Sequence, residues 1–317
     1  MLGKRTVTIA LAIVTAIALH ARETVRFMPA WTPQAQFAGF YVALDMGFYD
    51  EEDLDVVIEH MGINSSKPGI VRIAEGEIDM IGSHPIQALI ARDAGTKVVN
   101  TLQVTQNTGI MVVSHKPIVN LQSLEGAKIG RWQSGFSEIC ELSCKANNLN
   151  VIWVPFLNGI NLFLSGAVDA TVAMSYNEYN LLVEATGGIP EENCIHFSDY
   201  GYDIPEDGVY VTEEYYNTHR ETVEKFNRAT CRGWDYCIEH PDKALDIVMK
   251  WTEKTGIRTN RYHQSLMLKS MNGLLVNPRT GKADYSPIPE DKFNRLIQAL
   301  IDMQYISSPT SYKEFIK

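Results

Sequence analysis

Cysteine is scarce in this sequence, and its spacing does not suit a metal site or a disulfide framework. Five cysteines occur among 317 residues, so at least one thiol stays unpaired within a single chain. No Cys-x-x-Cys pair and no interleaved cluster of Cys and His is present. Cys140 and Cys144 would share one face of a predicted helix, whose fixed geometry disfavours a bridge. We therefore expect buried free thiols and no metal site.

An excess of positive charge is also missing. Lys and Arg number 28 against 38 Asp and Glu, which gives a formal net charge of -10. We expect no nucleic acid partner, because such partners require a basic surface. The phosphate-binding pattern Gly-x-x-x-x-Gly-Lys-[Ser/Thr] is absent, so nucleotide hydrolysis is unsupported. A chain of this length with 45% hydrophobic residues can bury two separate cores.

The apolar run at the N-terminus is too short to span a membrane. Lys4 and Arg5 precede an uncharged, largely apolar run at 6–19, well short of the roughly 20 residues that a spanning helix needs. The sequence Ala18-Leu-His-Ala21 follows as a cleavage site, so 1–21 is predicted to be a secretory signal peptide rather than an anchor. No cysteine for lipid attachment lies near Ala21. We therefore expect a soluble mature protein in the periplasm.

The most informative segment that is present joins two predicted strands through a proline-rich corner. Residues 24–28 alternate as a strand does, and Pro29 and Pro33 then force the chain out of the sheet. A helix of about two turns is predicted at 39–47, with a glycine at its end that suits a left-handed stop. The next strand is predicted at 55–58. The corner therefore lies at the carboxyl end of a strand, where open α/β sheets bind ligands.

Three residues of this corner are candidates for ligand contact. Trp31 can stack on a planar ligand, although it could instead anchor the core. Gln36 can offer both a donor and an acceptor, or can simply be solvated. Tyr41 is at helical spacing with Leu44, so a core position competes with a ligand contact.

The same segment resembles a known family. The matching pieces are Trp31-Thr-Pro, Gln36-Phe-Ala-Gly, Tyr41-Val-Ala, Gly47-Phe-Tyr and Asp53-Leu-Asp-Val, with a later match at 121–130. They are similar to the substrate-binding proteins of ABC importers that bind thiamine pyrimidine precursors. That family also includes nitrate, sulfonate and riboflavin binders and the eukaryotic pyrimidine synthases. The resemblance implies a type II periplasmic binding protein fold.

A weak internal repeat indicates two similar lobes. The sequence Gly76-Glu-Ile-Asp79 leads into a short apolar stretch at 80–84, and Gly166-Ala-Val-Asp169 leads into a similar stretch at 170–176. Each copy predicts a helix end, a turn at Asp, a buried strand and then polar or aromatic residues. Because the motif is short, chance similarity is the alternative. The repeat favours two strand ends that face a shared cleft.

The predicted fold class is therefore α/β, with two lobes joined by a two-strand hinge. Buried strands at 109–114 and 208–212 bracket the second lobe. Lobe one is expected to comprise 22–114 and 210–317, and lobe two 115–209. The C-terminal part is expected to be helical at 220–239, 241–255 and 289–304, with prolines near two helix starts.

Three further groups of polar and aromatic residues follow predicted strands. One group lies at a helix start after the strand near 80–82, where backbone N–H groups and the helix dipole can hold a ligand acceptor and where Ser83 is placed as the N-cap. A second lies in the glycine-bounded turn at 130–135, and a third follows the strand at 170–174. The candidate residues are Ser83 and His84, then Trp132, Gln133 and Ser134, then Tyr176, Asn177 and Glu178.

The chemistry of this set favours a neutral or weakly basic aromatic heterocycle. Rings, amides, hydroxyls and one carboxylate predominate, and Arg131 is the one strong cation nearby. Within the family, a thiamine pyrimidine precursor is the first choice and a flavin-type ring the second. Nitrate or a sulfonate remains an alternative, because backbone N–H groups alone can hold an anion.

The resemblance also implies the partners. We expect a monomer without cofactor that captures a small molecule between its lobes and delivers it to an ABC transporter permease. A solute sensor for a membrane receptor would use the same cleft. The pyrimidine synthases carry a cofactor-binding lysine where this chain has Ser83, so an enzyme is not expected.

Overall fold

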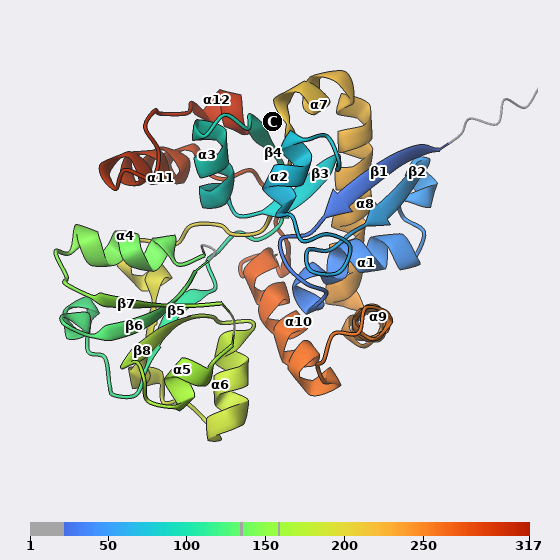
Figure 1. Cartoon of the computed structure of the whole chain (residues 1–317). Helices are drawn as coiled ribbons and strands as arrows, with labels where there is room; N and C mark the ends of the chain where they lie inside the picture. Colours follow the sequence, from blue (N-terminus) through green and yellow to red (C-terminus); the bar gives the residue numbers. More distant parts are fainter. Residues whose placement is uncertain (1–21, 134–135, 158) are drawn as a thin grey trace, which may run out of the picture.

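The protein folds into two α/β lobes, each built on a five-stranded sheet (Figure 1). The computed structural model describes residues 22–133, 136–157 and 159–317. The predicted signal peptide and Ser134 lie outside the described residues. Within them, no helix is both long and apolar enough to cross a membrane.

Lobe one contains a mixed sheet with the strand order β2-β1-β3-β10-β4. β1 pairs in parallel with β2 and β3, whereas β10 runs antiparallel to β3 and β4. The strict alternation of buried and exposed residues in β2 places every second side chain in the core. The strands are β1 (Glu23–Met28), β2 (Leu54–Ile58), β3 (Met80–Ser83), β4 (Val98–Gln103) and β10 (Gly208–Thr212).

Lobe two repeats this arrangement in the order β7-β6-β8-β5-β9. β6 pairs in parallel with β7 and β8, and β5 runs antiparallel to β8 and β9. Each sheet thus contains one strand that runs opposite to the others, β10 in lobe one and β5 in lobe two. Each of these strands directly follows a crossing of the chain between the lobes. The strands are β5 (Ile110–Ser114), β6 (Lys128–Trp132), β7 (Ile152–Phe156), β8 (Ala170–Met174) and β9 (Cys194–His196).

The predicted internal repeat is confirmed by equivalent strand pairing. Asp79 donates its backbone N–H to the carbonyl of Arg26 at 2.9 Å, and its carboxylate accepts from Arg26 N at 2.8 Å. Asp169 makes the same pair of contacts with Lys128, at 2.8 Å and 2.8 Å. Each aspartate fixes the strand that follows it beside a parallel neighbour, β3 beside β1 and β8 beside β6.

The boundary expected at residue 114 is wrong by one strand. β5 was expected to close lobe one, but it is a central strand of the second sheet, between β8 and β9. Its apolar residues are buried on both faces, a pattern that fits a central strand of either sheet. The chain therefore crosses to lobe two at 104–109 and returns at 201–207.

The two crossing segments are joined by hydrogen bonds. The hydroxyl of Thr105 accepts from the backbone N–H groups of Glu206 and Asp207 at 3.2 and 3.0 Å. The Glu206 carboxylate in turn accepts from Gly109 N at 2.6 Å and Ile110 N at 3.1 Å. These contacts make the double crossover a defined hinge between the lobes.

Helices cover both sheets, and all three expected C-terminal helices are present, as α8, α9 and α11. α10 is an additional helix, and the side chain of Asn260 caps its start by accepting from His263 N. α10 contacts both α9 of lobe one and α6 of lobe two. The helices are α1 (Ala38–Asp45), α2 (Gly69–Ala74), α3 (Pro85–Asp93), α4 (Glu138–Ala146), α5 (Asn161–Leu164), α6 (Glu178–Thr186), α7 (Glu213–Thr218), α8 (Arg220–Glu239), α9 (Pro241–Lys254), α10 (Arg261–Leu275), α11 (Glu290–Asp302) and α12 (Tyr312–Phe315).

Two glycines allow the close approach of α1 to α8. A Cβ on Gly39 would lie 2.3 Å from the Trp234 ring, and one on Gly233 would lie 2.1 Å from the carbonyl oxygen of Gly39. Gly47 ends the α1 region at a positive φ of 78°, as its placement in the sequence predicts. The corner that carries Trp31 is thereby fixed to the core of lobe one.

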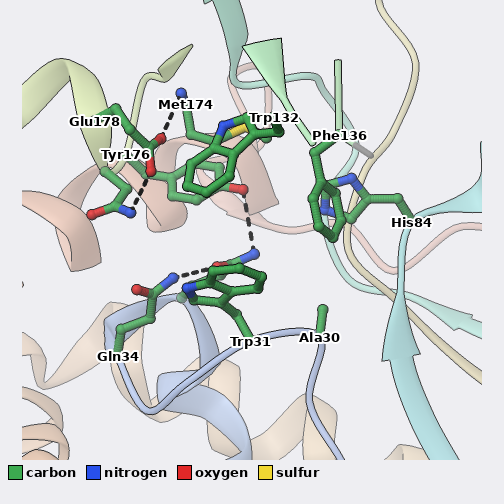
Figure 2. A pocket seen from close by; sticks show the side chains of 11 residues that line it. Ala30, Trp31, Gln34, His84, Trp132, Phe136, Met174, Tyr176 and Glu178 are labelled. Atoms are coloured by element: carbon green, nitrogen blue, oxygen red, sulfur yellow. Dashed lines mark hydrogen bonds between the residues drawn. The ribbon is translucent and has the colours of Figure 1, made fainter. Parts of the chain in front are cut away.

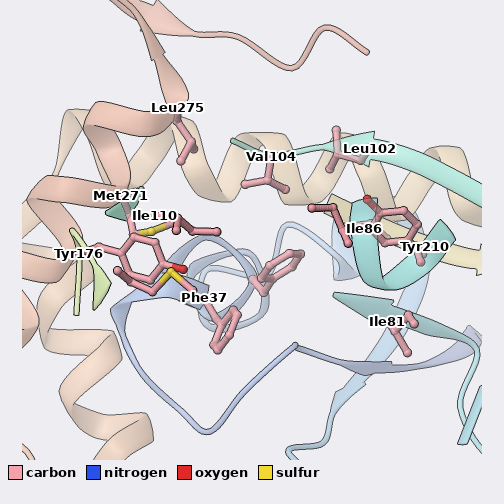
Figure 3. Packing of buried hydrophobic residues seen from close by; sticks show 14 of the residues in the cluster. Phe37, Ile81, Ile86, Leu102, Val104, Ile110, Tyr176, Tyr210, Met271 and Leu275 are labelled. Carbon is pink, nitrogen blue, oxygen red and sulfur yellow. The ribbon is translucent and has the colours of Figure 1, made fainter. Parts of the chain in front are cut away.

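The hydrophobic core continues through the hinge. Buried side chains such as Ile81 and Tyr210 in lobe one belong to the same cluster as Ile110 and Tyr176 in lobe two. Figure 3 shows this continuity around the crossing strands. A smaller separate cluster in lobe two includes Met111, Val113 and Leu182.

Candidate ligand-binding site

A small cavity lies between the lobes, next to the carboxyl ends of β1 and β3 on one side and of β6 and β8 on the other. Its volume is about 40 Å³. Figure 2 shows that side chains from both lobes point into it. The lining residues are Ala30, Trp31, Gln34, Gln36, His84, Trp132, Phe136, Met174, Tyr176, Asn177 and Glu178.

Aromatic rings from the two lobes meet across this cavity. The ring centroids of Trp31 and Trp132 are 5.7 Å apart at an interplanar angle of 77°. Phe136 approaches Trp31 edge-on at 6.3 Å and His84 at 4.9 Å. Because the two indoles touch, a flat ligand can enter between them only when the lobes move apart.

A buried chain of hydrogen bonds holds Trp31 in place. The Tyr41 hydroxyl lies 3.0 Å from His60 Nε2, and His60 Nδ1 lies 2.6 Å from the backbone carbonyl oxygen of Trp31. Burial lowers the pKa of His60 to about 4, so the ring is neutral at pH 7. A neutral ring can then donate from Nδ1 to Trp31 and accept at Nε2 from Tyr41.

Tyr41 is therefore a core residue, contrary to its prediction as a lining residue. Its side chain is fully buried, and its ring stacks on Trp251 with centroids 4.7 Å apart. The helical spacing with Leu44 already pointed to packing. Tyr41 affects the cavity only through His60 and the backbone of Trp31.

Trp132 forms the opposite wall at the end of β6. Its backbone N–H donates to the hydroxyl of Ser137 at 3.0 Å, and its ring packs against Phe156 with centroids 4.8 Å apart. The indole Nε1 is buried and has no hydrogen-bond partner among the described residues. A donor in this position can bind a carbonyl oxygen or a ring nitrogen of a ligand.

Glu178 supplies the main hydrogen-bond acceptor of lobe two. It is buried at the start of α6, where its carboxylate accepts from Met174 N at 3.0 Å and from Asn177 Nδ2 at 2.8 Å. Burial raises the pKa of Glu178 to about 7, despite the opposing effect of these hydrogen bonds. Its charge therefore changes near neutral pH.

Two acidic residues of the hinge, Glu206 and Asp207, lie beneath the cavity and are not among the predicted site residues. Gln36 Nε2 donates to both carboxylate oxygens of Asp207 at 3.1 Å and lies 3.3 Å from the Tyr176 hydroxyl. That hydroxyl lies 3.4 Å from Glu206 Oε2. The signal in the sequence is the pair Glu206-Asp207 directly before a buried strand, where two carboxylates need partners.

His84 completes the charged part of the site. Burial lowers its pKa, but Asp207, Glu206 and Glu138 together outweigh this effect, so the pKa is raised above its ordinary value. The Asp207 oxygen lies 3.6 Å from His84 Nε2. A positive His84 balances part of the negative charge of the hinge.

Seven of the predicted site residues line the cavity, whereas Tyr41, Ser83 and Gln133 do not. Ser83 is the half-buried last residue of β3, and His84 rather than Ser83 is the N-cap of α3. Gln133 is exposed beyond the end of β6, because the alternation of the strand turns Trp132 inward and the next side chain outward. Ser134 lies outside the described residues. The lining also contains four residues that are not among the predicted ones, namely Ala30, Gln34, Phe136 and Met174.

Comparisons with known proteins identify the family. The model of the NMT1/THI5-like family matches residues 34–244. The chain belongs to the NMT1/THI5-like family. The resemblance expected from the sequence is thereby confirmed.

Two curated relatives are named as binders of heterocyclic compounds. The chain is 28% identical over 240 residues to a formylaminopyrimidine-binding protein of Halalkalibacterium halodurans, covering 73% of this chain and 71% of the relative. It is 26% identical over 257 residues to the riboflavin-binding protein RibY of Chloroflexus aurantiacus, covering 78% and 72%. A more distant relative at 24% identity, THI13 of Saccharomyces cerevisiae, is named as a pyrimidine phosphate synthase, with coverage of 70% and 69%.

The fold is that of periplasmic binding proteins. The aliphatic sulphonate binding protein SsuA of Escherichia coli superposes with a TM-score of 0.70 at 13% identity, covering 92% of this chain and 96% of that one. At this identity, the similarity shows the fold alone. The expected two-lobed α/β architecture is confirmed.

Proposed function

We propose that this protein is the solute-binding component of an ABC importer and that it captures a flat, amino-bearing heterocycle between its lobes outside the cytoplasm. A pyrimidine of the thiamine-precursor type is the preferred ligand. The protein would act as a monomer and deliver the ligand to a membrane permease.

One observation carries this proposal: two indoles meet edge to face beside a buried carboxylate, and the described lining contains neither Lys nor Arg. Once the lobes open, Trp31 and Trp132 can hold a ring by stacking, while Glu178 accepts from its N–H groups. An inorganic anion would instead lie near Glu178 and Asp207, which repel it when ionised, and the histidine of the lining, His84, already faces Asp207 at 3.6 Å.

Size favours a single ring over a fused one. The cavity of about 40 Å³ is far smaller than most ligand pockets, so any such ligand requires the lobes to open, and a pyrimidine requires less opening than a flavin. A flavin is larger, although one relative is named as a riboflavin binder. Capture would proceed by bending at the double crossover and reclosing on the ligand, with no covalent step.

A thermal unfolding assay tests the proposal. The mature protein would be heated with formylaminopyrimidine, riboflavin, an alkanesulfonate or nitrate. A ligand that binds only the folded state stabilises it by about 2.7 kcal/mol at a hundred times its Kd. We expect the largest rise in melting temperature with formylaminopyrimidine. Stabilisation by the sulfonate or nitrate alone would overturn the choice of ligand.

A further inference from the structure

A histidine outside the cavity lining joins the two lobes. His263 lies on α10 of lobe one and is 5% exposed. Its Nδ1 lies 3.0 Å from Glu184 Oε1, and its Nε2 lies 3.0 Å from Asn177 Oδ1. Both partners belong to lobe two, on α6 or directly before it. These contacts exist only while the cleft is closed.

The contacts continue to the ligand-facing carboxylate. Asn177 lines the cavity, and its Nδ2 donates to Glu178 Oε1 at 2.8 Å. A continuous chain of hydrogen bonds therefore runs from Glu184 through His263 and Asn177 to Glu178.

The direction of this chain follows from the chemistry of its members. A carboxylate only accepts, so the amide group of Asn177 that faces an ionised Glu178 must be its NH₂ group. The amide oxygen then faces His263, and the Glu184 carboxylate faces the other ring nitrogen. Both ring nitrogens of His263 are thus donors in this arrangement.

A second arrangement contains the same number of protons. If His263 gives up its Nε2 proton and Glu178 takes one up, the Asn177 amide can turn over and direct its NH₂ group to the ring. Glu178 would then be a carboxylic acid whose one O–H donates to the Asn177 amide oxygen, because its other oxygen accepts from Met174 N, so the ligand would meet a neutral group in place of an ionised acceptor. His263 and its partners therefore decide which form the ligand meets.

The charged groups around His263 support the first arrangement. α6 contributes Glu184, whose carboxylate can only accept and lies 3.0 Å from Nδ1, and Glu178, which receives the NH₂ group of Asn177. The cation nearest in sequence on α10 is Arg261, which pairs with Asp246 of α9 at 2.7 Å. The short helix at Ala35–Phe37, which also contacts α10, contains no charged residue.

We propose that His263 is a positioning residue that orients the Asn177 amide on lobe closure and thereby keeps Glu178 a hydrogen-bond acceptor for ligand N–H groups. The choice of ligand class rests on the proposed function above. The bridge between His263, Glu184 and Asn177 can be tested without any ligand.

The first experiment measures the ring nitrogens of His263 by ¹⁵N NMR in the full mature protein at pH 7, assigned by comparison with His263→Gln. We expect both nitrogens to carry hydrogen in the wild type. In Glu184→Gln, we expect a larger fraction of rings with one bare nitrogen. A wild-type ring with only one protonated nitrogen overturns the inference, whatever the ligand proves to be.

The second experiment measures the affinity for formylaminopyrimidine from pH 5 to 9. In the wild type, affinity should rise as Glu178 ionises, since its pKa is raised to about 7 by burial. His263→Leu should lower the maximum affinity at least about tenfold, given the usual strength of hydrogen bonds to charged groups. His263→Gln keeps a donor toward Asn177 and should recover much of the affinity.

His196→Leu is the matched control. His196 pairs with Glu191 at 2.9 Å, but both residues belong to lobe two; His196 is half-buried and Glu191 is exposed. The affinity of His196→Leu for formylaminopyrimidine should depend on pH as that of the wild type does. An unchanged profile in His263→Leu would overturn the inference while leaving the proposed function intact. If formylaminopyrimidine does not bind the wild type but both ring nitrogens of His263 carry hydrogen, the choice of ligand is wrong. The inferred bridge between His263, Glu184 and Asn177 then still stands.

Discussion

The two walls of the cleft are built differently. The lobe-one wall presents Trp31, which a neutral chain through His60 and Tyr41 ties to the core. The lobe-two wall presents Trp132 beside Glu178, whose pKa burial raises to about 7. The first wall is therefore fixed by packing, whereas the second carries a charge that responds to pH and to the ligand. Under the proposed function, lobe one positions the ring and lobe two selects it.

The largest expected effect is on the lobe-two wall. Glu178→Gln removes a charged acceptor, and we expect affinity for formylaminopyrimidine to fall by about 1.5–3 kcal/mol. The free energy of unfolding of Glu178→Gln should rise relative to that of the wild type at the same pH. Because the folded-state pKa of Glu178 is raised to about 7, the wild type loses stability as pH rises from the ordinary carboxyl range through 7, by up to about 3 kcal/mol.

Glu178→Gln removes this penalty, so the variant should bind more weakly yet unfold at higher denaturant concentration at pH 8. Calorimetric titration and chemical unfolding measure the two effects. The pair of His196 with Glu191 offers a control position in the same lobe. If a folded Glu178→Gln variant binds formylaminopyrimidine as tightly as the wild type, the carboxylate of lobe two does not select the ligand.

On the lobe-one wall, pH is expected to change the stability of the fold by a comparable amount but in the opposite direction: stability is lost as pH falls. The folded-state pKa of His60 is about 4, below its usual 6.5, because burial disfavours the charged ring. The unfolded chain therefore binds a proton first as pH falls, and stability is lost between about 6.5 and 4. The loss amounts to about 3 kcal/mol at most.

His60→Gln should flatten this part of the pH dependence. Chemical unfolding of both proteins at pH 4.5 and 7.5 measures the difference. Equal slopes in the wild type and the variant would show that the ring is not held neutral beside Trp31.

A smaller effect separates Trp31 from Tyr41. Trp31→Ala should weaken ligand binding by at least about 1 kcal/mol, the scale of aromatic stacking. Tyr41→Phe should instead cost about 1 kcal/mol of stability, since it removes one buried hydrogen bond to His60, and leave affinity nearly unchanged. Titration calorimetry and unfolding on both variants make the comparison. A large loss of affinity in Tyr41→Phe would show that Tyr41 contributes to ligand binding.

Much of the fold follows from local patterns, and the errors arise where distant segments meet. Strand alternation, prolines and glycine stops predict β1, β2 and the ends of α1 correctly. The assignment of β5 fails because a strand buried on both faces suits either sheet equally well. Pairing partners are tertiary information that a single sequence does not contain.

The site shows the same division. Trp31, Trp132 and Glu178 are found from the sequence because each follows a predicted strand end. Asp207 and His263 are missed because their partners lie 171 and 86 positions away in the chain. Their roles depend on the closure of two lobes, which no local pattern encodes.

Under the proposed function, two indoles and one carboxylate select an amino-bearing ring. Calorimetric titration of the mature protein at pH 8, with formylaminopyrimidine and with an alkanesulfonate in parallel, tests this selection. We expect saturable binding of formylaminopyrimidine that weakens in both Trp31→Ala and Glu178→Gln, and no saturable binding of the sulfonate. Tight binding of the sulfonate, unaffected by Glu178→Gln, would contradict this selection.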